Sequence, residues 1–95
     1  MERLYIVIDD TLPTTYGCVQ GGHAVAEWIL KNPEDSTRWN NNYLIYLKGN
    51  IEQLKYKLDS NNLAYTEFKE PDLDNKITSI ALLGNNKFVK KLKNI

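Results

Sequence analysis

The chain has 95 residues, 42% of them hydrophobic, and it carries 12 basic and 12 acidic residues. This length supports one domain with a modest core, which we place over residues 1–95. The balanced charge argues against a dedicated duplex-DNA binder, and the lone Cys18 and lone His23 cannot supply the four ligands of a structural zinc site. No stretch approaches the ~20 apolar residues of a membrane span, and the N-terminal apolar run is too short for a signal peptide. We therefore expect a cytoplasmic protein without a membrane partner.

Residues 4–8 are β-branched, aliphatic and aromatic, and they predict a buried strand. Residues 16–31 predict the first helix, which ends before Pro33 because the residue preceding a proline disfavours the helical conformation. Val19, Ala26 and Leu30 lie on one apolar stripe of this helix, and Val25, Ile29 and Trp28 are adjacent to it. Gly21 and Gly22 each cost about 1 kcal/mol inside a helix, so they predict a close approach of its backbone to the sheet or to a ligand.

The remaining elements are also predicted from their residue patterns. In order, we expect a polar loop over 33–42, a strand over 43–47, a helix over 51–59, strands over 64–68 and 77–83 joined by an acidic loop at 70–76, and a last helix with Phe88, Leu92 and Ile95 on one face. The order β-α-β-α-β-β-α predicts a single-domain α/β fold, a mixed four-stranded sheet with flanking helices. Its first two strands should be parallel, because a helical crossover joins them, and its last two should be antiparallel.

The first helix carries the densest polar feature of the chain. Tyr16, Gln20 and His23 are spaced at i, i+4 and i+7 and therefore share one helix face. They follow the carboxyl end of the first strand, where α/β folds bind their ligands. Gln20 can orient a water or donate to a carbonyl. His23 can act as a general base or hold the loop by hydrogen bonds.

A second polar feature lies between the last two expected strands. Glu70, Asp72 and Asp74 fall within five residues, and such carboxylates can position a water, bind a cation or simply form a solvated turn. Thr78 and Ser79 open the following strand, and one of their hydroxyls should face the same end of the sheet as the acidic loop.

The stretch YGCVQGGHAV, residues 16–25, resembles the type 2 peptidyl-tRNA hydrolases, whose signature after the first strand is a Lys-x-Ala-Ala-Gln-x-x-His-Ala run. The resemblance implies their mixed four-stranded fold, hydrolysis of the ester between a peptide and the terminal ribose of tRNA, no cofactor and a homodimer. It maps the family's glutamine and histidine onto Gln20 and His23. The family's loop acid falls on Glu70 or Asp72 and its strand threonine on Thr78 or Ser79.

Two differences from the family lead to two hypotheses for the function. The family's lysine falls on Tyr16, and the acidic loop lacks the family's arginine, so positive charge is missing where an oxyanion or a phosphate would need it. The first hypothesis is an esterase with peptidyl-tRNA as its partner, in which Lys87, Lys90 and Lys91 contact phosphates. The second is a catalytically degenerate member of the same fold that binds a protein, a nucleotide or RNA. A solvated surface is the simpler explanation of the lysines.

Overall fold

The alternation of strands and helices forms an α/β fold in the computed structural model, which describes residues 2–95. Its regular elements are β1 (Arg3–Asp9), α1 (Thr14–Lys31), α2 (Pro33–Trp39), β2 (Tyr43–Gly49), α3 (Ile51–Ser60), β3 (Thr66–Glu70), β4 (Lys76–Leu83) and β5 (Lys93–Asn94). Two 3₁₀ turns, η1 (Pro71–Leu73) and η2 (Val89–Lys91), follow β3 and precede β5.

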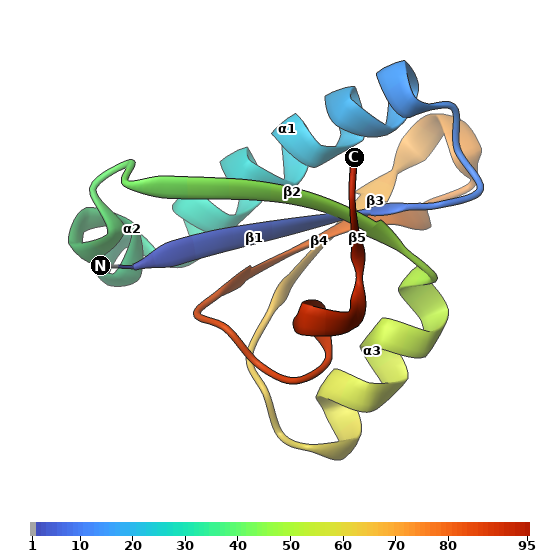
Figure 1. The fold of residues 1–95 in the computed structure, drawn as a ribbon. Helices are drawn as coiled ribbons and strands as arrows, with labels where there is room; N and C mark the ends of the chain where they lie inside the picture. The colour runs from blue at the N-terminus through green and yellow to red at the C-terminus, as the bar shows by residue number, and fades with distance from the viewer. Residues whose placement is uncertain (1) are drawn as a thin grey trace.

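The strands form one mixed, open sheet of five strands in the order β3-β4-β1-β2-β5. β1 and β2 are parallel and β3 and β4 are antiparallel, as the sequence predicts for the first two and last two long strands. Figure 1 shows α1 along one face of the sheet and α3 against the other, so the crossovers after β1 and β2 leave on opposite sides.

The prediction of four strands is wrong by one, because the chain ends in a short additional strand. β5 is antiparallel to β2, with Asn94 opposite Leu47 and Lys93 opposite Lys48. The free edge of β2 offers unpaired backbone groups at this point, and the last residues of the chain satisfy them.

The expected last helix is also absent. The Asn86 side chain accepts hydrogen bonds from the backbone N–H groups of Phe88 and Val89, at 2.8 and 3.0 Å, and these bonds start the single turn η2. Val89 is buried, while Phe88 and Leu92 are half-buried against the same core cluster. The backbone path of this segment is therefore determined by contact with the core and by pairing with β2. The helical spacing of Phe88, Leu92 and Ile95 does not determine it.

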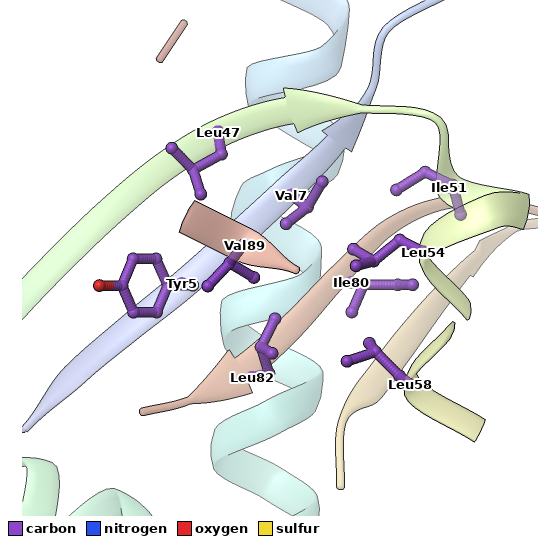
Figure 2. Packing of buried hydrophobic residues seen from close by; sticks show 9 residues of the cluster. All are labelled: Tyr5, Val7, Leu47, Ile51, Leu54, Leu58, Ile80, Leu82 and Val89. Atoms are coloured by element: carbon purple, nitrogen blue, oxygen red, sulfur yellow. The ribbon is translucent and has the colours of Figure 1, made fainter. Parts of the chain in front are cut away.

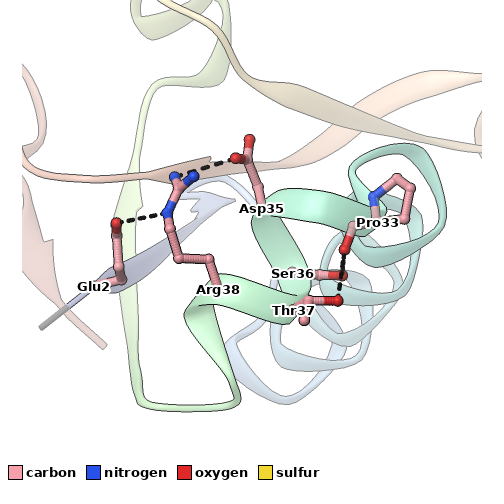
Figure 3. Close-up of polar contacts among 6 residues, drawn as sticks. All are labelled: Glu2, Pro33, Asp35, Ser36, Thr37 and Arg38. Carbon is pink, nitrogen blue, oxygen red and sulfur yellow. Dashed lines mark hydrogen bonds and ion pairs between the residues drawn. The ribbon is translucent and has the colours of Figure 1, made fainter.

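The segment expected as a polar loop over 33–42 contains a helix, α2. Pro33 occupies its first turn, where the missing N–H costs nothing, and Ser36 and Thr37 donate to the Pro33 carbonyl. Arg38 bridges Asp35, at 3.1 Å, and Glu2, at 3.0 Å (Figure 3). The helix ends at Asn40, whose φ of 51° lies in the left-handed region that asparagine tolerates.

The face of α1 that packs on the sheet is not its apolar stripe. The buried residues of α1 are Gly17, Gln20, Gly21, Ala24 and Trp28, whereas the stripe is exposed, with Val19 at 55% and Leu30 at 78%. A Cβ atom on Gly21 would lie 2.7 Å from the Tyr46 ring, so this glycine confirms the predicted close approach. Gly22 does not approach the sheet, because a Cβ on it would meet nothing within 4 Å.

A second cluster fills the opposite face of the sheet, under α3. Ile51, Leu54 and Leu58 of the helix pack on residues of β1, β2 and β4 (Figure 2), as the amphipathic pattern predicts. Asn50 caps α3, because its side chain accepts from the backbone N–H of Gln53 at 3.0 Å. The two faces of the sheet thus have separate cores, and α1 is held in place over β1, β3 and β4.

Candidate functional site

Thr78 and Ser79 are consecutive residues of β4, yet both hydroxyls reach α1 because the strand contains a β-bulge. Phe68 of β3 pairs with Ser79, whereas Lys69 pairs with Ile77, so Thr78 is the extra residue. Neighbouring residues of a regular strand point to opposite faces, and a bulge re-aims one of them. Thr78 and Ser79 are both 0% exposed.

Gln20, which is 1% exposed, connects these hydroxyls to the acidic segment. Thr78 Oγ1 donates to Gln20 Oε1 at 2.6 Å, and Gln20 Nε2 donates to Glu70 Oε1 at 2.9 Å. Ser79 Oγ donates to the backbone carbonyl of Gln20 at 2.8 Å. The carboxamide has one allowed orientation, because an ionised carboxylate only accepts hydrogen bonds. We call this arrangement the Thr78–Gln20–Glu70 chain.

Tyr16 lies beside the end of this chain. Partial desolvation, the negative charges of Glu70 and Asp72, and a hydrogen bond to Glu70 raise the pKa of the Tyr16 phenol above its ordinary value of 10.0. The phenol therefore stays protonated at neutral and mildly alkaline pH. Where the resembled family has a permanent cation, this chain has a neutral hydrogen-bond donor.

His23 does not join the Thr78–Gln20–Glu70 chain. Its ring stacks on Phe68, with centroids 4.7 Å apart and an interplanar angle of 13°, and the residue is exposed. The i, i+3 spacing from Gln20 places it one helical turn further along α1. The stacked pair joins α1 to β3, and no polar partner of His23 is found among residues 2–95.

The two carboxylates that the sequence left as alternatives have different surroundings. Glu70 is half-buried at the end of β3 and receives the Gln20 carboxamide, while Asp72 is exposed in η1 and influences the site only through its charge on Tyr16. The two hydroxyls also have different acceptors, since Thr78 donates to the Gln20 side chain and Ser79 donates to the Gln20 backbone carbonyl.

The lysines expected to contact phosphates lie away from this chain. Lys90 and Lys91 are in η2 and Lys87 just before it, at the edge of the sheet that β5 forms. β3 carries Glu70 at the other edge, four strands away, which is roughly 19 Å at normal strand spacing. Among residues 2–95, no ion pair is found for these three lysines.

Lys31, Lys69 and Lys76 could in principle replace the family's lysine, but each pairs with an acid other than Glu70. The pairs are Lys31 with Glu27 at 3.3 Å, Lys69 with Glu67 at 3.8 Å, and Lys76 with Asp9 at 3.1 Å. Lys76 is the cross-strand partner of Glu70, but its ammonium pairs with Asp9, and no ion pair between a lysine and Glu70 is found among residues 2–95.

Sequence reasoning missed Asp9, which organises the turn from β1 into α1. The residue is 7% exposed, and its Oδ1 accepts from the N–H and the hydroxyl of Thr11, both at 3.0 Å. The two acids and the threonine that close the first strand were the available signal, since Asp followed two residues later by Thr is typical of such turns. Asp9 also borders a pocket of about 380 Å³ at the carboxyl ends of β1 and β2, with Asn50, Lys69 and Lys76 among its lining residues.

The comparisons with known proteins leave the family open. The chain matches no protein-family model and no curated protein. Within residues 2–95, no helix is both long enough and apolar enough to cross a membrane.

The site offers one carboxylate in a fixed orientation, that of Glu70. A general base must be within hydrogen-bond reach of a water and must present a free lone pair to it. Glu70 accepts from Gln20 through Oε1 and lies beside the Tyr16 phenol, and because it is still partly exposed it can meet both conditions. Gln20 has both ends of its carboxamide engaged, which makes it a residue that positions Glu70.

Proposed function

We propose that this protein is an esterase that hydrolyses peptidyl-tRNA, with Glu70 as the general base. The observation that carries the proposal is the Thr78–Gln20–Glu70 chain, in which a buried carboxamide aims a half-buried carboxylate. The chain is built on the Gln-x-x-His-Ala segment that resembles the type 2 peptidyl-tRNA hydrolases.

In the proposed reaction, Glu70 takes a proton from a water as that water attacks the ester carbonyl. The tetrahedral intermediate collapses, the bond to the ribose oxygen breaks, and the proton on Glu70 returns to that oxygen. The Tyr16 phenol donates to Glu70 and helps to hold the carboxylate, and the pair of stacked rings, His23 and Phe68, borders the substrate. Lys87, Lys90 and Lys91 contact phosphates further along the tRNA, and the reaction takes place in the cytoplasm.

The second candidate function is a binding module for RNA, a nucleotide or a protein on the same surface. The concentration of acid around the site favours it, since Glu70, Asp72 and Asp74 lie close in sequence and the nearby Lys69 and Lys76 pair with other acids. A site without a cation stabilises a developing oxyanion less.

Hydrolysis of an N-blocked aminoacyl-tRNA under single-turnover conditions distinguishes the two candidates. We expect the wild type to release free tRNA and Glu70→Gln to lose about 10²–10⁴-fold in rate, the usual contribution of a general base. Asp72→Asn is the matched control, because it removes a neighbouring charge that is outside the Thr78–Gln20–Glu70 chain. Tight binding of the substrate without release by a folded wild-type protein would favour the binding module.

A further inference from the structure

Two lysines lie directly opposite each other where β5 pairs with β2. Lys48 of β2 is the partner of Lys93 of β5, so the two side chains are neighbours on one face of the sheet. Both residues are exposed, and no ion pair is found for either of them among residues 2–95. Like charges at directly opposite positions destabilise a strand pair, and β5 has only two residues. An anion bound between the two ammonium groups would remove this repulsion.

The sheet register places the Lys48–Lys93 pair on the same face as the Thr78–Gln20–Glu70 chain. Lys48 is aligned with Ile8 of β1, which packs in the cluster under α1. Ile8 is opposite Ser79 of β4, whose hydroxyl donates to the α1 backbone. Ser79 is in turn opposite Phe68 of β3, whose ring stacks on a side chain of α1. The pair is therefore the β5 end of one row of side chains that are all on the α1 face.

The lysines of η2 are on the opposite face of the sheet. Val89 of this turn packs in the cluster under α3, and Lys90 and Lys91 follow it directly. The Lys48–Lys93 pair is separated from β3 by three and four strand spacings, roughly 14 and 19 Å. A line of phosphates that leads from Glu70 across the α1 face to η2 therefore rounds the sheet edge at the Lys48–Lys93 pair.

Charge is divided between the two edges of the sheet, although the chain as a whole is neutral. Glu70, Asp72 and Asp74 lie in and just after β3, whereas residues 84–95 contain four lysines and no acidic residue. The β3 edge repels a polyanion and the β5 edge attracts it. An ester attached to RNA is therefore favoured at Glu70 with its phosphates directed toward β5.

We infer that Lys48 and Lys93 bind a backbone phosphate of the RNA part of the substrate. This inference rests on the proposed function, because it states where the tRNA lies when its ester is at Glu70. The distance from β3 corresponds to about four to six nucleotides of a stacked strand. A phosphodiester strand carries one charge per nucleotide, so a single strand can contact this pair and the η2 lysines in succession.

Binding of deacylated tRNA, followed by fluorescence anisotropy at several salt concentrations, tests the inference without requiring hydrolysis. We expect Lys48→Gln and Lys93→Gln each to weaken binding about threefold or more. Each should also reduce the slope of log affinity against log salt by about 1. Lys57→Gln is the matched control, because Lys57 is also exposed, is on the outward side of α3 and loses the same charge. It should bind tRNA as the wild type does.

Lys93→Glu separates phosphate binding from misfolding and from simple protection of the sheet edge. It replaces a like-charge pair with an opposite-charge pair, so the melting temperature at low salt should stay constant or rise. A charge of either sign keeps an edge strand from pairing with other chains. We nevertheless expect tRNA binding to fall further than in Lys93→Gln, because the new carboxylate repels a phosphate.

Single-turnover hydrolysis of an N-blocked aminoacyl-tRNA gives a second readout. In Lys48→Gln the enzyme concentration at half-maximal rate should rise, while the maximal rate stays within a few-fold of wild type. A wild type that binds no tRNA, equal weakening by Lys57→Gln, or unchanged binding in Lys93→Glu would overturn the inference. Binding of polyglutamate through these lysines in place of tRNA would also overturn it, in favour of an acidic protein partner. A wild type that binds tRNA through the pair without releasing it would contradict the esterase and support the phosphate site.

Discussion

Thr78 decides which way the Gln20 carboxamide points, because its hydroxyl donates to Gln20 Oε1 in a fully buried position. Thr78→Val keeps the shape and removes the donor, which leaves a buried acceptor unpaired at a cost of about 1–3 kcal/mol. The carboxamide can then rotate away from Glu70, and we expect the hydrolysis rate to fall about tenfold or more. Thermal unfolding and single-turnover kinetics measure the two effects.

Ser79→Ala is the matched control for Thr78→Val. It also removes a buried hydroxyl donor, but the bond it breaks is to the backbone carbonyl of Gln20. We expect a comparable loss of stability with a clearly smaller loss of rate. Equal rate losses in the two variants would contradict a specific role of Thr78 in orienting the carboxamide.

Asp9 makes folding sensitive to acid. Burial raises its pKa, but hydrogen bonds from Thr11 and Lys76 together with the Lys76 charge lower it more, so the pKa lies below its ordinary value of 3.8. A carboxyl group with a lowered pKa contributes stability above its unfolded pKa and loses it as the pH falls through the folded value. This contribution is therefore complete at neutral pH and disappears below about pH 4.

Asp9→Asn tests that contribution. The amide oxygen still accepts from Thr11, while the charge that pairs with Lys76 is lost, so we expect the free energy of unfolding at pH 7 to fall by about 1–2 kcal/mol. The difference between the variant and the wild type should shrink as the pH is lowered from 5 to 2. A difference that is constant over this range in urea denaturation would contradict a charged Asp9 in the folded state.

At the scale of elements, the two adjacent glycines of α1 should respond in opposite ways to the same substitution. Gly21→Ala places a methyl group 2.7 Å from Tyr46 Cε2 and 3.1 Å from Ile6 Cγ2. We expect it to reduce stability by about 1–3 kcal/mol through overpacking. Gly22→Ala meets open space and should raise stability by up to about 1 kcal/mol. Chemical denaturation of both variants against the wild type measures the difference, and a loss of stability in Gly22→Ala would be inconsistent with an open position.

The sequence was informative about elements whose local pattern agrees with their tertiary environment. The strand over 4–8 and the helix over 51–59 combine a clear period with clear end signals, and both are found with only small changes of boundary. The exposed stripe of α1 could not be predicted this way, because Val19 and Leu30 have the composition of a core. Small and polar residues pack on the sheet in their place, since Gly17 and Gly21 allow the close approach that brings Gln20 into contact with β4.

The residues that contribute to the candidate site could be predicted from the sequence, but the hydrogen bonds that join them could not. Spacing alone brings Tyr16, Gln20 and His23 to one helix face. The choice of Glu70 over Asp72 depends on where β3 ends, and the choice of Thr78 over Ser79 depends on the bulge between β3 and β4. A bulge of one residue leaves no clear mark in a short apolar strand, so sequence reasoning had to keep both alternatives.

At the scale of the whole molecule, the fold places two groups of polar residues at opposite edges of the sheet. The Thr78–Gln20–Glu70 chain lies between α1 and the β3 edge, whereas the C-terminal lysines lie in and just before η2, near the β5 edge. Val89 of η2 packs in the cluster under α3, so this turn is on the other face of the sheet from α1. A substrate that contacts both groups must therefore extend across four strand spacings, roughly 19 Å, and around the sheet edge.

The most direct test of Glu70 as the general base is the rate at which Glu70→Gln and Asp72→Asn release tRNA from an N-blocked aminoacyl-tRNA, beside the wild type and with all three proteins folded. We expect release by the wild type, a loss of at least about 10²-fold in Glu70→Gln and a rate within a few-fold of wild type in Asp72→Asn. A wild-type rate in Glu70→Gln, or a larger loss in Asp72→Asn than in Glu70→Gln, would contradict the assignment of Glu70 as the general base.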